Sequence, residues 1–428
     1  MAPPRSPDGP ALDYLSPLPP VRSGIADYSV DLLPHLAAGG DVRVLGLPGQ
    51  PVDEAVAARF GVVPAAEAQP PSGRTVWEES PRLPLYQMGN NLHHHPVHEA
   101  ALARPGVLVL HDLVLHHLVA EESLGHGDFE AYRSRLAADH GWIGEEAARP
   151  REWGAEVITS LFELPAHRTV LRRQRGVLVH NRWAAARIAE DDPEVRVGVV
   201  PMAVPLPPPA DQEAGRAFRR RHGVPEGAPV LGSFGFQTPI KRTAVVVEAL
   251  AAPGLAGAHL LVVGETVADL DARARELGVA DRVHVTGFVP YAEFEAAIAA
   301  CDLALNLRYP TAGETSASLL RVLAVGRPAV VSDFAQFTEL PEAVAVKAPL
   351  GEGEVAGLVR ELAALLADPG RLAAMGAAAR EHVRTCHDPA AAAGEVWAAC
   401  REWAGAPPPD GRPGEHPAAP PPPTSLVR

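Results

Sequence analysis

The stretch that decides the fold is residues 306–341, NLRYPTAGETSASLLRVLAVGRPAVVSDFAQFTELP. Alternating leucines at 303–307 predict a strand, and turn-forming residues at 309–313 predict a loop after it. The Glu-Thr-Ser run at 314–316 predicts the start of a helix, and a second apolar strand follows at 329–332. A helix that starts there points free backbone N–H groups and the positive end of its dipole at an anion. The pattern also fits an ordinary crossover in a parallel sheet, where a hydroxyl residue only caps the helix.

The same alternation of strands and helices extends outward from this stretch. Short apolar runs that end in glycine or a polar residue predict strands, and runs with apolar residues at helical spacing predict helices. This alternation indicates parallel, doubly wound sheets. The predicted strands begin near residue 12 and cover 42–47, 83–88, 106–110, 176–179, 195–200, 230–234, 259–263, 283–286, 303–307 and 329–332, and the clearest helices cover 25–38, 183–190, 243–251, 355–366, 371–383 and 390–403.

A proline-rich segment divides this pattern into two halves. Four prolines fall within 205–209, and proline continues neither a strand nor a helix. We therefore predict an α/β fold of two doubly wound, Rossmann-like domains that face each other across a cleft. The predicted organisation is a disordered N-terminus at 1–10, an N-terminal domain at 11–204, a linker at 205–210, a C-terminal domain at 211–384, a helix at 385–404 that packs back towards the N-terminal domain, and a disordered proline-rich tail at 405–428.

Composition and charge narrow the class of protein. Of 428 residues, 47% are hydrophobic and 21% charged, as in a soluble protein of two domains. The net charge of −14 disfavours a nucleic-acid partner, which would select a basic surface. No apolar run has the length of a membrane span, and MAPPRSPDGP lacks the apolar core of a signal peptide. The three cysteines have no metal or redox spacing, so we expect a reduced, cytoplasmic enzyme, with peripheral membrane contact left open.

Polar side chains come shortly after three of the predicted strands. These are Asn90, His111 and His180, and the carboxyl ends of such strands are where doubly wound sheets bind ligands. We expect Asn90 and His180 to face the cleft and His111 to hydrogen bond to a bound substrate. Asp112 is expected to cap the helix that follows it.

Two adjacent cations, Lys241 and Arg242, follow Gly235 at the end of another predicted strand and precede a helix. Cations at a helix start oppose the dipole by ~0.3–1 kcal/mol, which favours a site that binds an anion. The chain otherwise uses arginine, and its lysines are Lys241 and Lys347. The pair is therefore predicted to bind a diphosphate through charge-assisted hydrogen bonds, with a solvated pair as the alternative.

Two further patterns are weak candidates for sites. Histidines at 93–95 and 98 suggest a metal, but neighbours on one helix point in different directions. We expect one of them to face the cleft and the others to be solvated. The glycines of 351–357 resemble a dinucleotide fingerprint, yet Glu352 and Glu354 would repel a pyrophosphate and suit a helix N-terminus better. No metal site and no bound cofactor are therefore expected.

Five segments together resemble the retaining glycosyltransferases of family 4, which have the GT-B fold of two Rossmann-like domains. The order and spacing of the segments carry the resemblance, which covers residues 12–403. The segments are SPLPPVRSGIADYS at 16–29, GVLVLHDLVLHH at 106–117, VGVVPMAV at 197–204, GSFGFQTPIKRT at 232–243, and the stretch at 306–341.

The resemblance implies a nucleotide-diphosphate sugar held mainly by the C-terminal domain and an acceptor hydroxyl held mainly by the N-terminal one. It implies transfer with retention and without a metal. Its candidate catalytic residues are His111 at the donor sugar, Lys241 at the diphosphate and Glu314 at the sugar hydroxyls. The other donor-binding residues that it implies are Ser23 and Gly24 near the phosphate, Phe288 and Val289 at the base, Thr315 and Ser316 with N–H groups for the phosphates, and Gly235 and Arg242 beside Lys241.

Two positions depart from the family pattern. Phe236 stands where family members usually have an arginine, for which Arg242 is a candidate substitute. Arg321 stands where the resemblance places a ribose-binding glutamate, so the ribose contact has no assigned residue.

Three hypotheses for the function stay open at this point. The leading one is a retaining glycosyltransferase with a saccharide, lipid-linked or small-molecule acceptor. The others are a sugar-nucleotide epimerase of the same fold and a non-catalytic nucleotide-sugar binding protein, while an NAD-dependent oxidoreductase is disfavoured. The sequence does not specify the donor base, its sugar, the acceptor or the oligomeric state.

Overall fold

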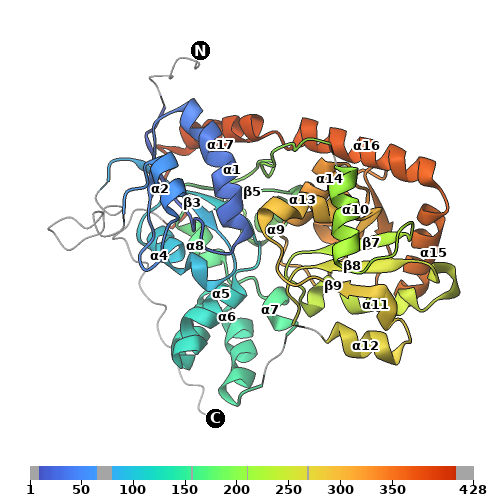
Figure 1. Cartoon of the computed structure of the whole chain (residues 1–428). Helices are drawn as coiled ribbons and strands as arrows, with labels where there is room; N and C mark the ends of the chain where they lie inside the picture. The colour runs from blue at the N-terminus through green and yellow to red at the C-terminus, as the bar shows by residue number, and fades with distance from the viewer. Residues whose placement is uncertain (1–8, 65–79, 156–157, 210, 268, 411–428) are drawn as a thin grey trace, which may run out of the picture.

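The computed structural model describes residues 9–64, 80–155, 158–209, 211–267 and 269–410. Over these residues the chain forms two six-stranded parallel sheets with helices packed around them (Figure 1). The prediction of an α/β fold with two doubly wound domains is therefore confirmed.

The N-terminal domain is built on a sheet of order β2-β1-β3-β4-β5-β6. Its strands are β1 (Leu12–Leu15), β2 (Val42–Leu45), β3 (Leu83–Met88), β4 (Val107–Leu110), β5 (Gly176–Val179) and β6 (Val197–Val199). Its helices are α1 (Gly24–Gly39), α2 (Glu54–Phe60), α4 (His95–Ala103), α5 (His116–Ser123), α6 (Phe129–Glu152), α7 (Ser160–Glu163), α8 (Arg168–Arg172) and α9 (Arg182–Asp191).

The alternation of side chains along the strands explains why this sheet is buried on both faces. Leu12 and Tyr14 of β1 join a core that includes residues of α1. Leu15 points to the other face and joins a core with residues of α4. Since every residue of β1 is buried, the sheet needs helices on each side of it.

The C-terminal domain repeats this arrangement with the order β12-β11-β10-β7-β8-β9. Its strands are β7 (Val230–Phe234), β8 (His259–Val263), β9 (Val283–Val285), β10 (Leu303–Asn306), β11 (Ala329–Ser332) and β12 (Ala345–Ala348). Its helices are α10 (Gln212–Arg221), α11 (Thr243–Leu250), α12 (Leu270–Glu276), α13 (Tyr291–Ala299), α14 (Ala317–Val325), α15 (Glu354–Leu366) and α16 (Pro369–Cys386), with short 3₁₀ turns η3 (Pro239–Lys241) and η6 (Ala335–Glu339).

Each sheet has one point at which the order of its strands reverses. In the N-terminal sheet this point lies between β1 and β3, and in the C-terminal sheet between β10 and β7. Loops that leave a sheet beside such a point diverge to opposite faces and leave a crevice in which ligands bind. The crevices of the two domains therefore lie at the loops that follow β1, β7 and β10.

The last helix, α17 (Pro389–Trp403), returns to the N-terminal domain and lies against α1 (Figure 1). The indole Nε1 of Trp397 donates a hydrogen bond to the carbonyl of Leu36 at 3.0 Å. The predicted disorder from residue 405 onward is wrong for 405–410, because Arg172 holds the Asp410 carboxylate at 2.6 Å. The rest of the predicted tail, 411–428, lies outside the described residues.

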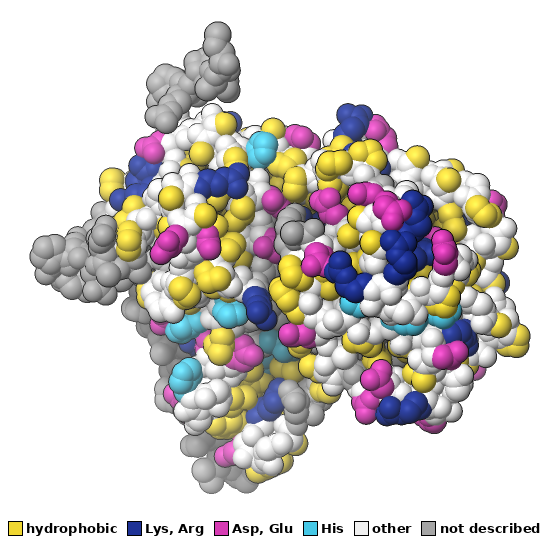
Figure 2. All heavy atoms as spheres, viewed as in Figure 1, with side chains coloured by type: hydrophobic (Ala, Val, Ile, Leu, Met, Phe, Trp, Pro, Cys, Tyr) yellow, Lys and Arg dark blue, Asp and Glu magenta, His cyan; other side chains and the backbone are white. Residues whose placement is uncertain are grey.

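Figure 2 shows the charged side chains on one face of the molecule. In the view of Figure 2, basic and acidic side chains are interspersed over both lobes. Among the described residues, no helix combines the length and apolar character that crossing a membrane requires.

Candidate functional site

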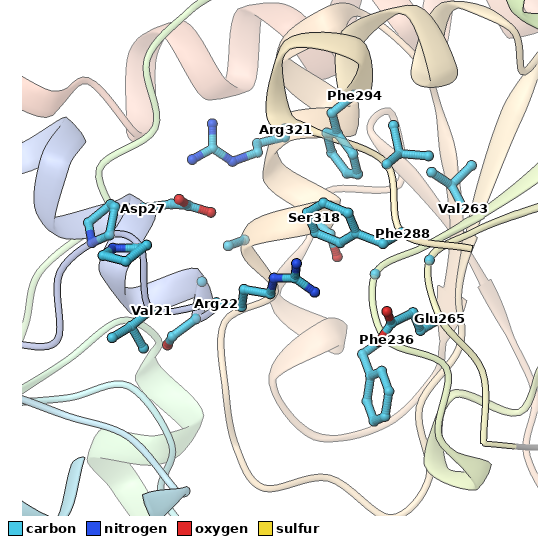
Figure 3. A pocket seen from close by; sticks show the side chains of 18 residues that line it. Val21, Arg22, Asp27, Phe236, Val263, Glu265, Phe288, Phe294, Ser318 and Arg321 are labelled. Atoms are coloured by element: carbon cyan, nitrogen blue, oxygen red, sulfur yellow. The ribbon is translucent and has the colours of Figure 1, made fainter. Parts of the chain in front are cut away.

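A cavity of about 530 Å³ lies between the two domains, at the crevices that the strand order creates (Figure 3). The loop after β1 and the start of α1 form one wall. The loops after β7, β8 and β9 and the first turn of α14 form the other. The lining residues are 19–24 and Asp27 from the N-terminal domain, and Gly235, Phe236, Val263, Gly264, Glu265, Phe288, Val289, Phe294, Ala317, Ser318 and Arg321 from the C-terminal domain.

Five of the predicted donor-binding residues meet at this cavity: Ser23, Gly24, Gly235, Phe288 and Val289. Ser23 is the N-cap of α1, and its hydroxyl accepts a hydrogen bond from the Ile25 N–H at 3.3 Å. A Cβ on Gly24 would meet nothing within 4 Å, so the start of α1 is open to the cavity. The Gly24 N–H and the positive dipole end of α1 are therefore available to an anion there.

An arginine and a phenylalanine from opposite domains meet across the cavity. The Arg22 guanidinium carbon lies 4.6 Å from the centre of the Phe288 ring, a cation–π contact. Phe288 is 53% exposed and Phe236 is 55% exposed, so both rings present an apolar face to the opening. A planar, aromatic part of a ligand would find a stacking partner there.

Arg321 stands at the position where the resemblance places a ribose-binding glutamate, and it reaches from the C-terminal domain to the N-terminal domain. It lies 2.8 Å from the Asp31 carboxylate of α1, and Figure 3 shows it directed towards α1 near Asp27. Burial raises the pKa values of Asp27 and Asp31, and Arg321 opposes both shifts. Asp27 is a cavity carboxylate that the sequence analysis missed, although it lies one helical turn beyond Ser23 in a helix whose start was predicted.

Lys241 lies close to Gly235, the glycine that follows β7. Its Nζ donates to the carbonyl of Phe234 at 2.6 Å, and a Cβ on Gly235 would approach Nζ to 2.8 Å. Gly235 also has φ +84°, a conformation that favours glycine. Burial and, to a smaller extent, the nearby Arg308 lower the pKa of Lys241 to about 7, while Glu314 opposes the shift. The ammonium group therefore lies in a poorly solvated place, with the Phe234 carbonyl as its hydrogen-bond partner.

Glu314 is held by a cation that the sequence analysis did not single out. Its Oε1 lies 2.7 Å from a terminal guanidinium nitrogen of Arg308, and its Oε2 accepts from the Thr311 hydroxyl at 3.1 Å. Arg308 follows β10 by two residues, at the same sheet edge as the loop after β7. The signal that could have found it is a charged residue placed directly after a buried strand.

The helix in the opening stretch begins at Ala317, later than predicted. Ser316 is its N-cap, with its hydroxyl 3.3 Å from the Leu319 N–H and 3.0 Å from the side-chain oxygen of Asn306. Thr315 faces the other domain, since its hydroxyl accepts from the Asn181 amide at 3.1 Å. The helix start is later because Gly313, at φ +76°, and Ser316 have non-helical backbone conformations.

His111 is buried rather than presented to the cavity. One ring nitrogen lies 2.9 Å from the side-chain amide of Gln87, and the other lies 3.2 Å from Nε2 of His180. His180 in turn lies 3.0 Å from the carbonyl of Val200, so its Nδ1 carries the proton. Burial lowers the pKa of both histidines, to about 4 for His180. Both rings are thus neutral and engaged within the N-terminal domain, and the structure brings neither to the cavity wall.

Asn90 and Asp112 do not have the roles that were predicted for them, which were facing the cleft and capping a helix. The side-chain oxygen of Asn90 accepts from the Leu118 N–H at 3.0 Å, so Asn90 fixes the first turn of α5 and does not face the cleft freely. The predicted cap by Asp112 is wrong, because its carboxylate accepts from the backbone N–H of Asn90 at 2.9 Å. Burial and the nearby Glu314 raise the pKa of Asp112 to about 7. Asp112 therefore belongs to the charged group around Glu314.

Arg242 forms an ion pair with Glu354 of the C-terminal domain. Its Nε donates to Glu354 at 2.6 Å, and a second guanidinium nitrogen bonds the other carboxylate oxygen. Glu354 is buried at the start of α15, as expected of a charge that favours a helix N-terminus. The bidentate pair holds Arg242 away from Lys241, so the predicted cation pair is not brought together.

The histidines at 93–95 and 98 differ in their surroundings. His94 is fully buried and His98 lies 3.0 Å from the buried Glu122, so the expectation that they are solvated is wrong for both. Within the described part of the chain, no group of three or more His, Cys, Asp or Glu side chains could hold a metal ion.

Backbone contacts join the two domains beside the cavity. The Val114 N–H donates to the carbonyl of Ala312 at 3.1 Å, and the Asn181 amide donates to the carbonyl of Gly313 at 3.0 Å. A Cβ on Gly313 would approach Cβ of Leu113 to 2.6 Å. The loop that carries Glu314 therefore lies directly on the loop after β4.

Comparison with known proteins finds relatives of the C-terminal domain and structures similar to the whole chain. Residues 228–368 match the family model described as glycosyl transferases group 1. A curated relative, the 2-deoxystreptamine glucosyltransferase of Streptomyces kanamyceticus, is 32% identical over 226 residues, which are 50% of this chain and 57% of the relative. The chain thus spans little more than half the length of that relative.

Solved structures resemble nearly the whole chain. HepE from Anabaena in complex with UDP superposes with a TM-score of 0.61 and 16% identity over 91% of this chain and 99% of its own. Sucrose-phosphate synthase from Thermosynechococcus elongatus has a TM-score of 0.63 and 16% identity over 92% of this chain and 98% of its own. Residues 228–368 are therefore similar to the glycosyl transferases group 1 family, and the chain has the GT-B fold of two Rossmann-like domains.

Proposed function

We propose that the protein is a glycosyltransferase that moves a sugar from a nucleotide-diphosphate sugar to an acceptor hydroxyl, with retention and without a metal. One observation carries the proposal. The cavity between the domains collects the start of α1, the glycine after β7, the residues after β9 and the start of α14, next to the buried cation Lys241. An aromatic wall, two helix starts and a cation suit a base, a diphosphate and a sugar in one ligand.

The donor would lie along the cavity with its base at Phe288 and Val289. The diphosphate would then reach Lys241 and the free N–H groups at the first turn of α14, which Ala317 and Ser318 contribute to the lining. The sugar would lie towards Glu314, whose carboxylate oxygens accept hydrogen bonds from hydroxyl groups. His111 and His180 would shape the sugar site from behind rather than contact the reacting carbon.

The chemistry needs stabilisation of charge more than a covalent partner. Breaking the bond between the anomeric carbon and the phosphate oxygen leaves negative charge on the diphosphate and positive charge on the sugar ring. Lys241 and the α14 N-terminus are fixed before the reaction, and removing one such group typically costs on the order of 10²–10³ in rate. Domain closure over the cavity would exclude the water that otherwise hydrolyses the donor.

The relatives suggest which substrates to test first. The curated relative is named for glucosyl transfer to 2-deoxystreptamine, and structures of HepE hold UDP or UDP-glucose. UDP-glucose is therefore the first donor to test. Aminocyclitols and other small polyols come first among saccharide, lipid-linked and small-molecule acceptors.

The test is product analysis with UDP-, GDP-, ADP- and TDP-glucose, in EDTA, with and without a panel of acceptors. NMR of the product would show an α-linked sugar from an α-linked donor. Lys241→Ala should lower transfer and donor hydrolysis by on the order of 10²–10³. Conversion of the free donor to its epimer would replace the proposal with an epimerase. Tight binding without turnover against any acceptor would replace it with a binding protein, and absence of binding would reject it.

A further inference from the structure

Arg308 stands at the centre of the charged group beside the cavity. It leaves β10 on the same edge as Gly235, and its backbone N–H is fixed by the Ser332 hydroxyl at 2.9 Å. Its side chain is 12% exposed. One guanidinium nitrogen lies 2.7 Å from Glu314, another lies 3.5 Å from the Ser316 hydroxyl, and the buried Nε has no hydrogen-bond partner.

This arginine is poorly compensated for a buried cation. Its neighbour Lys241 is also positive, and each cation makes the other less favourable. The start of α14, capped by Ser316, adds a positive dipole end to the same place. The negative charge that offsets these cations comes from Glu314 and from the half-buried Asp112, whose pKa is raised to about 7. The positive charge of Arg308, Lys241 and the α14 N-terminus therefore favours the binding of an additional anion.

We propose that Arg308 binds the diphosphate of the donor together with Lys241, and that it exchanges its contact with Glu314 for the phosphate when the donor enters. The inference rests on the proposed function, because it takes the ligand to be a nucleoside diphosphate. A guanidinium presents parallel N–H groups that match two phosphate oxygens, and its unsatisfied Nε–H supplies one of them. The exchange leaves Glu314 free to accept hydrogen bonds from the sugar.

Arg242 offers the matched contrast. It follows Lys241 directly in sequence, but its Nε and one of its terminal nitrogens both bond the buried Glu354 carboxylate. Breaking that pair would leave a buried charge at the start of α15 without its partner, which is costly. Within the described residues, Arg308 contacts only one carboxylate oxygen, that of Glu314, and its Nε has no hydrogen-bond partner. Arg308 is therefore the cation that can reorient to bind a ligand.

The experiment is calorimetric titration of UDP, GDP, ADP and TDP, and of the matching nucleotide-glucose, into wild type, Arg308→Gln, Arg308→Lys and Glu314→Gln. Arg360→Gln is the control, since Arg360 is 70% exposed and pairs with Glu361 on the surface. The midpoint of thermal unfolding of each variant reports folding. The nucleoside diphosphate that binds wild type is then compared across the variants.

We expect Arg308→Gln to weaken binding of that diphosphate on the order of 10- to 100-fold, because charge-assisted hydrogen bonds are lost. Arg308→Lys should weaken binding less. Glu314→Gln should tighten binding of the diphosphate alone, because Arg308 is no longer held, and should weaken binding of the nucleotide sugar relative to the diphosphate. A folded Arg308→Gln that binds like wild type would overturn the inference while the proposed function stands. So would a Glu314→Gln that weakens both ligands equally. If wild type binds none of the four diphosphates, the proposed function and this inference fall together.

Discussion

The carboxylate of Glu339 in the C-terminal domain accepts a hydrogen bond from the backbone N–H of Trp183 in the N-terminal domain, at 2.6 Å. Its other oxygen accepts from the Arg182 N–H at 3.1 Å, so one side chain satisfies the first two N–H groups of α9. A carboxylate at a helix N-terminus contributes ~0.3–1 kcal/mol. Glu339 therefore stabilises the observed arrangement of the two domains.

Substituting Glu339→Gln should shift the unliganded protein towards a more open arrangement. The amide keeps the size of the side chain but loses the charge that the helix dipole favours. Small-angle X-ray scattering should give a larger radius of gyration than for wild type. Glu342→Gln, at an exposed position three residues on, is the control. Identical scattering curves for wild type and Glu339→Gln would show that other contacts hold the domains closed.

Gly313→Ala should weaken the contact between the two domains at a different point. Gly313 has φ +76°, which costs a residue with a Cβ roughly 1–2 kcal/mol, and the new Cβ would press on Leu113 of the other domain. We expect a lower midpoint of thermal unfolding and weaker binding of the donor. Gly257→Ala is the matched control, because a Cβ there meets nothing within 4 Å and Gly257 lacks a positive φ. Equal effects of the two substitutions would mean that the contact with Leu113 is irrelevant.

Lys241 should make donor binding depend on pH. Its pKa of about 7 means that the free protein loses this cation as the pH rises above neutrality, while a bound diphosphate would favour the protonated form. The affinity for UDP should therefore fall between pH 6 and pH 9 in wild type and should change less in Lys241→Met. Calorimetric titration over this pH range checks it, and the difference between the two proteins removes the titration of UDP itself. Parallel pH profiles would exclude Lys241 as the responsible group.

The same pKa also predicts how stability responds to pH. The folded pKa of Lys241 lies below its unfolded value of 10.5, so the unfolded chain binds more protons between pH 7 and pH 10.5. The free energy of unfolding of wild type relative to Lys241→Met should therefore rise with pH in that window. Denaturant unfolding at pH 7 and pH 9.5 measures the difference. A constant difference would contradict the burial of an uncompensated ammonium group.

Asp112 should show the opposite pH response. Burial and the neighbouring Glu314 raise its pKa from 3.8 to about 7, so the folded protein binds the extra proton between these values. Its contribution is favourable below pH 4 and is lost as the pH rises through 7. Asp112→Asn should therefore be more stable than wild type at pH 8 and not at pH 4, by denaturant unfolding. Asp271→Asn, an exposed position on α12, serves as the control for a lost surface charge.

The strands could be predicted closely where they are fully buried. The bounds of β3, β5, β7, β8 and β11 match the predicted ones. Every residue of these strands is buried, as expected for a parallel sheet that is covered on both faces. β12 escaped prediction because its four residues, Ala345–Ala348, include a lysine and give no clear period.

The residues themselves predicted the part of the site that depends on local chain geometry. Gly235 follows from a turn signal directly after a strand, whereas Ser23, Gly24, Phe288 and Val289 were placed by the family resemblance. The partners of Arg242 and Asn90 could not be deduced in this way. Glu354 is 112 positions from Arg242, and the N–H that Asn90 fixes is 28 positions away. His111 was misplaced because a residue just past a strand can turn into its own domain, and His180, 69 positions on, supplied the partner.

Trp403 should hold the end of the chain on the N-terminal domain. Its indole covers β5 and β6 so closely that a Cβ on Gly176 would overlap the ring, and a Cβ on Gly198 would come within 3.2 Å of it. Trp403 is 8% exposed, so Trp403→Ala should destabilise this domain by about 3–5 kcal/mol through the cavity that it leaves. Trp153→Ala is the control, because Trp153 is 78% exposed. Hydrogen exchange should increase in β5 and β6 for Trp403→Ala and stay unchanged in β8 and β9. An increase confined to α17 would mean that the sheet is stable without its last helix.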